Sequence, residues 1–125
     1  MLQVIDDKIY HVKGDAEILP VNLSIGENTP YEMGENEYLV LTVRAIPDTA
    51  SPALFIAKSS PGSNRIIITK EMTADMDPGY YSADIEIKNA DISPNTVWPD
   101  NTIGYVKPDK SRNWKNYILT PEVTS

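Results

Sequence analysis

Residues 77 to 88 read Asp77-Pro78-Gly79-Tyr80-Tyr81-Ser82-Ala83-Asp84-Ile85-Glu86-Ile87-Lys88, and this pattern sets the expected fold class. The first three residues are typical of a turn, because proline fixes φ at the first central position and glycine accepts the positive φ that often follows. The chain then alternates, with Tyr81, Ala83, Ile85 and Ile87 on one face and Ser82, Asp84, Glu86 and Lys88 on the other. A period of two with one apolar and one charged face predicts a half-buried antiparallel strand.

The spacing Asp77-x-Gly79-x-Tyr81 adds a more specific signal. It is similar to the tyrosine corner of immunoglobulin-like sandwiches, in which a tyrosine near the start of strand F donates a hydrogen bond to the backbone a few residues upstream. We expect the Tyr81 hydroxyl to reach the backbone between Thr73 and Asp77. The alternative is an ordinary turn followed by an ordinary strand. Antibody domains carry a cysteine two residues after this tyrosine, but Ala83 stands there and the chain has no cysteine, so an intersheet disulfide is excluded.

Length and composition predict one all-β domain over residues 1–125. The chain can bury one core without disulfides or metals, and its 10 prolines and 6 glycines favour many turns and short strands. About seven apolar runs predict an immunoglobulin-like antiparallel β-sandwich with a long connection between strands F and G. Tyr38 to Ile46 is apolar on both sides and should be a central strand, whereas Pro20 indicates an edge strand or a bulge. Residues 71–76 suit one helical turn. The apolar face of the first stretch should pack against Leu39, Leu41 and Val43.

Charge and hydropathy narrow the function classes. The formal net charge of −7 disfavours nucleic-acid binding, and the one local basic group, interleaved with Asp109, consists of Lys107, Lys110, Arg112 and Lys115. No apolar run approaches the roughly 20 residues of a membrane span, and the first seven residues lack the pattern of a signal peptide. The sequence therefore predicts a soluble protein without a signal peptide.

Residue types for catalysis or metal binding do not come together in the sequence. It has no nucleophile elbow, no phosphate-binding glycine loop and no His-Glu-x-x-His site. His11 is the only histidine and so has no partner for a His-rich metal site. Asp75 and Asp77 have the spacing of calcium ligands, but the calcium-loop pattern stops at Gly79. We therefore expect no enzyme activity, no cofactor and no metal.

The segment from Asn89 to Asn113 is the one candidate for function, because long connections in compact domains are often binding loops or disordered segments. Its aromatic residues suit a stacking or interface patch with basic residues at the rim. The alternative is that the two tryptophans cover the end of the core. The candidate interface residues are Trp98, Tyr105, Lys107, Lys110, Arg112 and Trp114.

Five stretches form a recognisable set in order: Lys13-Gly14-Asp15-Ala16, Tyr38 to Ile46, Ile66-Ile67-Ile68-Thr69-Lys70-Glu71-Met72-Thr73, Pro78-Gly79-Tyr80-Tyr81-Ser82-Ala83-Asp84-Ile85, and Tyr117-Ile118-Leu119-Thr120-Pro121-Glu122-Val123-Thr124. Together they resemble the Ig-like domains of phage and prophage tail and upper-baseplate structural proteins. The resemblance covers nearly the whole chain. The chain departs from the family pattern at Asn89 to Asn113, which is longer than the family's usual turn, so no partner surface is carried over there.

The resemblance implies a non-enzymatic structural or assembly module of a phage or prophage particle. Such a protein is made in the bacterial cytoplasm and then built into a virion or tail-like particle. Its partners would be other particle proteins or further copies of the same chain in a homo-oligomer. The alternative is a carbohydrate- or receptor-binding β-sandwich module that uses Trp98, Tyr105 and Trp114. The resemblance supplies no catalytic residues.

Overall fold

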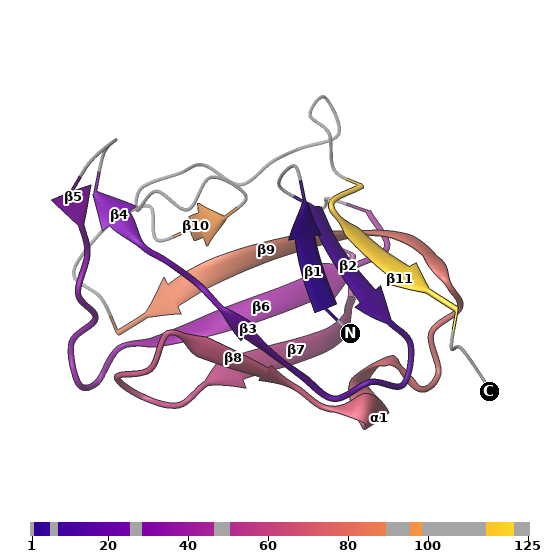
Figure 1. Cartoon of the computed structure of the whole chain (residues 1–125), viewed down its shortest axis with the longest axis horizontal. Coiled ribbons are helices and arrows are strands. Elements are labelled where there is room, and N and C mark those ends of the chain that lie inside the picture. The colour runs from indigo at the N-terminus through magenta and orange to yellow at the C-terminus, as the bar shows by residue number, and fades with distance from the viewer. Residues whose placement is uncertain are drawn as a thin grey trace.

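A computed structural model of the chain describes residues 2–5, 8–25, 29–46, 51–89, 96–98 and 115–121. These residues form strands and one short helix, so the predicted all-β class is confirmed (Figure 1). The elements are β1 (Leu2–Ile5), β2 (Lys8–Val12), β3 (Glu17–Pro20), β4 (Ser24–Ile25), β5 (Thr29–Pro30), β6 (Tyr38–Arg44), β7 (Ala53–Ser59), β8 (Arg65–Ile68), α1 (Lys70–Thr73), β9 (Gly79–Lys88), β10 (Thr96–Trp98) and β11 (Tyr117–Thr120).

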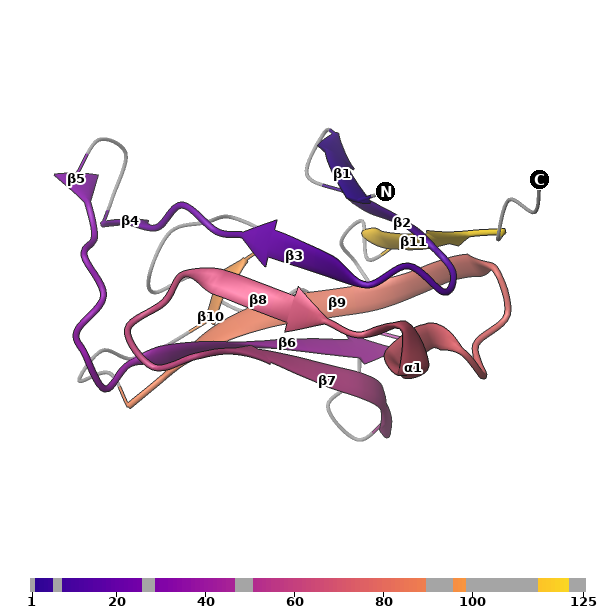
Figure 2. The same ribbon diagram turned by 60° about the horizontal axis from the view of Figure 1, so that its bottom comes forward.

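The main sheet follows the order β1-β2-β11-β9-β6-β7-β8-β3, with β10 also paired to β9, while β4 and β5 form a separate ribbon. Figure 2 shows β6 and β7 in one layer and β1, β2, β11 and β3 in the other, with β9 and β8 connecting the layers. The two ends of the order, β1 and β3, approach each other without pairing. The sheet is therefore nearly barrel-shaped, with an incomplete closure between β1 and β3.

One strand pair departs from the predicted antiparallel arrangement. β11 runs parallel to β2, with Tyr117 opposite Ile9 and Thr120 opposite Val12. Nearly the whole chain separates these two strands, so no short hairpin turn forces them to be antiparallel. The expectation that all strands pair antiparallel is therefore wrong for this pair. The described residues also contain the short strands β4, β5 and β10.

The longest strand, β9, changes partner along its length. Residues 79–81 pair with β11, and residues 82–88 pair with β6 on the other edge. Its predicted inner face is confirmed, because Ala83, Ile85 and Ile87 are at most 2% exposed. They lie opposite the three residues predicted to pack against them, Val43, Leu41 and Leu39. Tyr81 is half-buried against the same core.

Three further predictions from the sequence hold. β6 lies between β9 and β7 and is buried on both faces, as expected of a central strand. β3 ends the sheet order, with Pro20 opposite Arg65, so the edge position of the proline is confirmed. The helical turn expected at residues 71–76 corresponds to α1.

The core lies between the two layers. Within it the rings of Phe55 and Tyr117 meet edge to face, with centroids 5.8 Å apart. The buried apolar side chains come from both layers: Ile9, Leu19, Val21, Leu23, Leu39, Leu41, Val43, Phe55, Ala57, Ile66, Ile68, Met76, Ala83, Ile85, Ile87, Tyr117 and Leu119.

Candidate functional site

The Tyr81 hydroxyl donates a hydrogen bond to the backbone carbonyl oxygen of Asp77, within the range expected from the sequence. Burial, and then the nearby Asp77 carboxylate, raise the pKa of Tyr81, since both disfavour a phenolate. Gly79 is the first residue of β9, with φ of 158°, so it belongs to the strand more than to the turn. This contact anchors the turn that enters β9.

The predicted aromatic and basic interface is largely outside the described part of the chain. Trp98 lies in β10, where its backbone pairs with that of Ile85. The other five residues, Tyr105, Lys107, Lys110, Arg112 and Trp114, lie outside the described residues. The interface at Asn89 to Asn113 therefore stays a prediction.

The described residues contain no cluster of three or more histidine and acidic side chains able to hold a metal ion. None of their helices has the length and apolar character that crossing a membrane requires. A cavity of about 200 Å³ lies where β1 approaches β3, and its lining is aliphatic except for the exposed Asn22. Such a lining offers packing but no nucleophile, acid or base.

Three polar side chains join β2, β11 and β9 inside the protein. We call this set the polar seam, and it consists of His11, Tyr117 and Asn116. His11 and Tyr117 are both fully buried. The Nε2 atom of His11 lies 2.9 Å from the carbonyl oxygen of Asp15, and Nδ1 lies 2.6 Å from the Tyr117 hydroxyl. A neutral imidazole that donates from Nε2 satisfies both contacts, because Nδ1 then accepts from the hydroxyl.

Burial shifts the titration of both rings in the polar seam. It lowers the pKa of His11, although the hydrogen bond to the Asp15 carbonyl opposes this, and it raises the pKa of Tyr117. In both cases the low-dielectric interior disfavours the charged form. The neutral form of His11 is therefore the one that its buried position favours.

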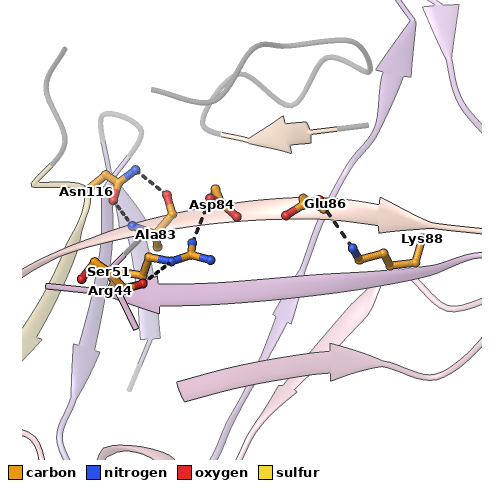
Figure 3. Close-up of polar contacts among 7 residues, drawn as sticks. All are labelled: Arg44, Ser51, Ala83, Asp84, Glu86, Lys88 and Asn116. Atoms are coloured by element: carbon orange, nitrogen blue, oxygen red, sulfur yellow. Dashed lines mark hydrogen bonds and ion pairs between the residues drawn. The ribbon is translucent and has the colours of Figure 1, made fainter. Parts of the chain in front are cut away.

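Asn116, the residue before β11, extends the pairing of β9 past the start of that strand. Its side chain accepts from the Ala83 N–H at 2.8 Å and donates to the Ala83 carbonyl oxygen at 2.9 Å (Figure 3). Its own carbonyl oxygen accepts from the N–H of Ile9. A side-chain amide thus takes the place of a neighbouring strand, and Asn116 itself is 2% exposed. Nothing in the sequence distinguishes this asparagine from one in a loop.

The outer face of the sheet over β9 and β6 is polar, and its positive side chains form ion pairs with carboxylates of the same chain. Arg44 pairs with Asp84 at 3.5 Å and donates to the Ser51 carbonyl oxygen, while Lys88 pairs with Glu86 at 3.6 Å (Figure 3). The aliphatic side chain on this part of the face, Val40, is only 8% exposed. This half of the outer face leaves little apolar surface in water.

The outer face over β7, β8 and β3 is different. Four large aliphatic side chains point away from the core and are 43–53% exposed; we call them the outer apolar patch: Ile18, Leu54, Ile56 and Ile67. Ile67 lies opposite Ile18 on one side and opposite Lys58 on the other. Ile56 is two residues before Lys58 and so shares its face. The four residues therefore form one surface across three neighbouring strands.

Sequence reasoning missed the outer apolar patch. The sequence did contain a signal, because two strands have aliphatic residues at consecutive positions where alternation would place polar ones. Ile67 stands between Ile66 and Ile68, and Leu54 and Ile56 flank Phe55. A strand that is apolar on both faces is either covered on both faces or exposes one of them. Only the structure shows that β7 and β8 expose one.

Comparisons with protein-family models, with curated proteins and with solved structures find no match to this chain.

Proposed function

We propose that this chain is a non-enzymatic structural module that assembles into a phage or prophage tail or baseplate particle, and that it docks through the outer apolar patch. The observation that carries the proposal is the half-exposure of four aliphatic side chains on adjacent strands. Scattered exposed aliphatics need no explanation, but a contiguous apolar surface marks an interaction site in many soluble proteins.

The strand arrangement supports an Ig-like architecture within this proposal. If β9 is strand F, as the Tyr81 contact suggests, then β6, β9 and β11 follow the order C-F-G. The pairing of β3 with β8 then corresponds to strands B and E. The resemblance of the sequence to phage Ig-like domains therefore has a compatible scaffold.

An apolar outer sheet face suits a role in assembly better than a role in catalysis. Two sheets can pack face to face when their aliphatic side chains interdigitate. Interface centres are apolar and depleted of charge, with polar groups at the rim. The outer apolar patch has this composition, because its charged neighbours Lys58 and Arg65 stand beside it.

The test is co-expression of the chain with the products of its flanking genes, followed by size exclusion with light scattering. We expect a homo-oligomer or a stable complex with a flanking product. The double variant Ile56→Ser, Ile67→Ser should stay folded and lose that assembly. The matched control is Val4→Ser, Ile5→Ser, since these aliphatics on β1 are each 51% exposed but lie outside the patch. A strict monomer that binds no flanking product would contradict the assembly role.

A further inference from the structure

The two charged residues that lie beside the outer apolar patch are both positive. Lys58 lies directly opposite Ile67 across the β7–β8 pair, and Arg65 lies two residues before Ile67 on the same face of β8. Both cationic residues are exposed, and neither forms an ion pair with a described residue. The centre of the patch therefore has two positive charges beside it that the described chain does not neutralise.

The contrast with the neighbouring half of the same face is informative. Over β9 and β6, Arg44 and Lys88 each have a carboxylate within 4 Å, at Asp84 and Glu86. The chain as a whole carries 18 acidic against 11 basic residues. Lys58 and Arg65 thus place two positive charges beside an apolar surface, and these charges favour a partner that supplies negative charge.

This charge pattern disfavours two other occupants. If the patch packed on the same patch of a second copy across a twofold axis, Lys58 and Arg65 would approach their own equivalents, and like charges oppose such a contact. An anionic membrane would attract two cations only weakly, while the net charge of −7 would oppose its approach.

We infer that the outer apolar patch binds a protein surface whose aliphatic or aromatic centre is flanked by carboxylates. This inference rests on the proposed function, and it adds the chemistry of the partner. The partner's apolar side chains cover Ile67, Ile56 and Ile18, and its carboxylates meet Lys58 and Arg65 at the rim. Rim charges of this kind act mainly on association rate and partner choice.

A displayed library of random peptides of about 12 residues tests this chemistry directly, whichever protein the natural partner is. Peptides selected on the parent protein should be enriched in Asp and Glu on both sides of aliphatic or aromatic residues. Their binding should weaken by at least about tenfold in Lys58→Glu, Arg65→Glu, and similarly when NaCl rises from about 0.05 to about 0.5 M. The matched control is Lys8→Glu, Lys13→Glu, which makes the same change in net charge on and beside β2.

Each other outcome overturns the inference in a distinct way. If Ile67→Ser abolishes binding but the charge reversal at residues 58 and 65 does not, the patch docks a partner without acidic chemistry, and only the inference fails. If the selected peptides bind every variant equally, the patch is not the docking surface, and the proposed route of assembly fails with it. If Ile67→Ser dissociates a homo-oligomer of the parent but Lys58→Glu, Arg65→Glu does not, the occupant is a second copy that packs without acidic chemistry. Flotation with phosphatidylserine vesicles that depends on Lys58 and Arg65 would assign the surface to lipid.

Discussion

In the polar seam, His11, Tyr117 and Asn116 find their hydrogen-bond partners inside the chain, whereas in the outer apolar patch four aliphatic side chains stand half in water. The seam joins strands from distant parts of the sequence. The outer apolar patch lies on three strands whose opposite faces supply the core residues, so it contributes little to the stability of the fold.

This difference predicts different roles for the two regions: the polar seam stabilises the fold, and the outer apolar patch docks a partner. A buried polar group that loses its partner costs more than the hydrogen bond itself contributes. Substitutions in the polar seam should therefore change the free energy of unfolding. Substitutions in the outer apolar patch should cost less stability and act mainly on association.

The largest effect expected within the polar seam is at Asn116. Asn116→Ala leaves the buried N–H and carbonyl of Ala83 without their partner, which should cost about 2–4 kcal/mol of unfolding free energy. Urea titration measures the loss. Asn22→Ala is the matched control, since Asn22 is exposed and should change stability by less than about 0.5 kcal/mol. Equal losses of unfolding free energy in the two variants would show that the hydrogen bonds of Asn116 do not stabilise the fold.

A smaller effect is expected at Tyr81, which lies outside the polar seam. Tyr81→Phe removes the hydroxyl that donates to the Asp77 carbonyl and should cost about 1 kcal/mol. Tyr80→Phe is the matched control, because the neighbouring Tyr80 is 63% exposed and its ring keeps the contact with Lys115. Full stability of Tyr81→Phe in a urea titration would show that the contact does not support the turn before β9.

The polar seam should also give the protein a pH dependence in mildly acidic solution. Burial lowers the pKa of His11 below its ordinary value of 6.5, so the unfolded chain takes up the proton at a higher pH than the folded chain. This contribution to stability is complete above pH 6.5 and declines as pH falls toward the pKa of the folded state. Urea titrations between about pH 7.5 and 5 should show the decline in the parent, and His11→Gln should remove it. An identical slope in that variant would exclude His11 as its source.

The smallest expected effect on stability is in the outer apolar patch. Ile67→Ser should cost about 1 kcal/mol or less, because the side chain is already 48% exposed. The adjacent Ile66 is fully buried, so Ile66→Ser should cost about 3 kcal/mol or more. Thermal or urea unfolding of the pair gives the contrast directly. A large loss at Ile67 would mean that the patch is part of the core.

The local features of the fold were predictable from the sequence, and the non-local ones were not. The alternation of Asp77 to Lys88 specified β9 and its inner face, and the apolar stretch from Tyr38 to Ile46 specified the central strand, because both signals lie within one strand. The parallel pairing of β11 with β2, the amide of Asn116 on Ala83, and the partners of His11 depend on residues far apart in the chain. No periodicity within a segment encodes such contacts.

The same limit applies to the candidate docking sites: residue type can be read from the sequence, but exposure cannot. The aromatic and basic residues of Asn89 to Asn113 stood out in the sequence because of their type. The outer apolar patch did not, since Ile18, Ile56 and Ile67 look like ordinary strand residues until their exposure is known.

The absence of cysteine from the chain allows a direct test of whether the outer apolar patch is covered on assembly. Single variants Ile67→Cys and Val4→Cys place a thiol in the patch and at a similarly exposed aliphatic position on β1. Maleimide labelling is then measured for each variant alone and in the assembly obtained by co-expression with the flanking gene products. We predict that assembly slows the labelling of residue 67 strongly and leaves that of residue 4 unchanged. Equal labelling of residue 67 in the free and assembled protein would contradict the docking role of the patch.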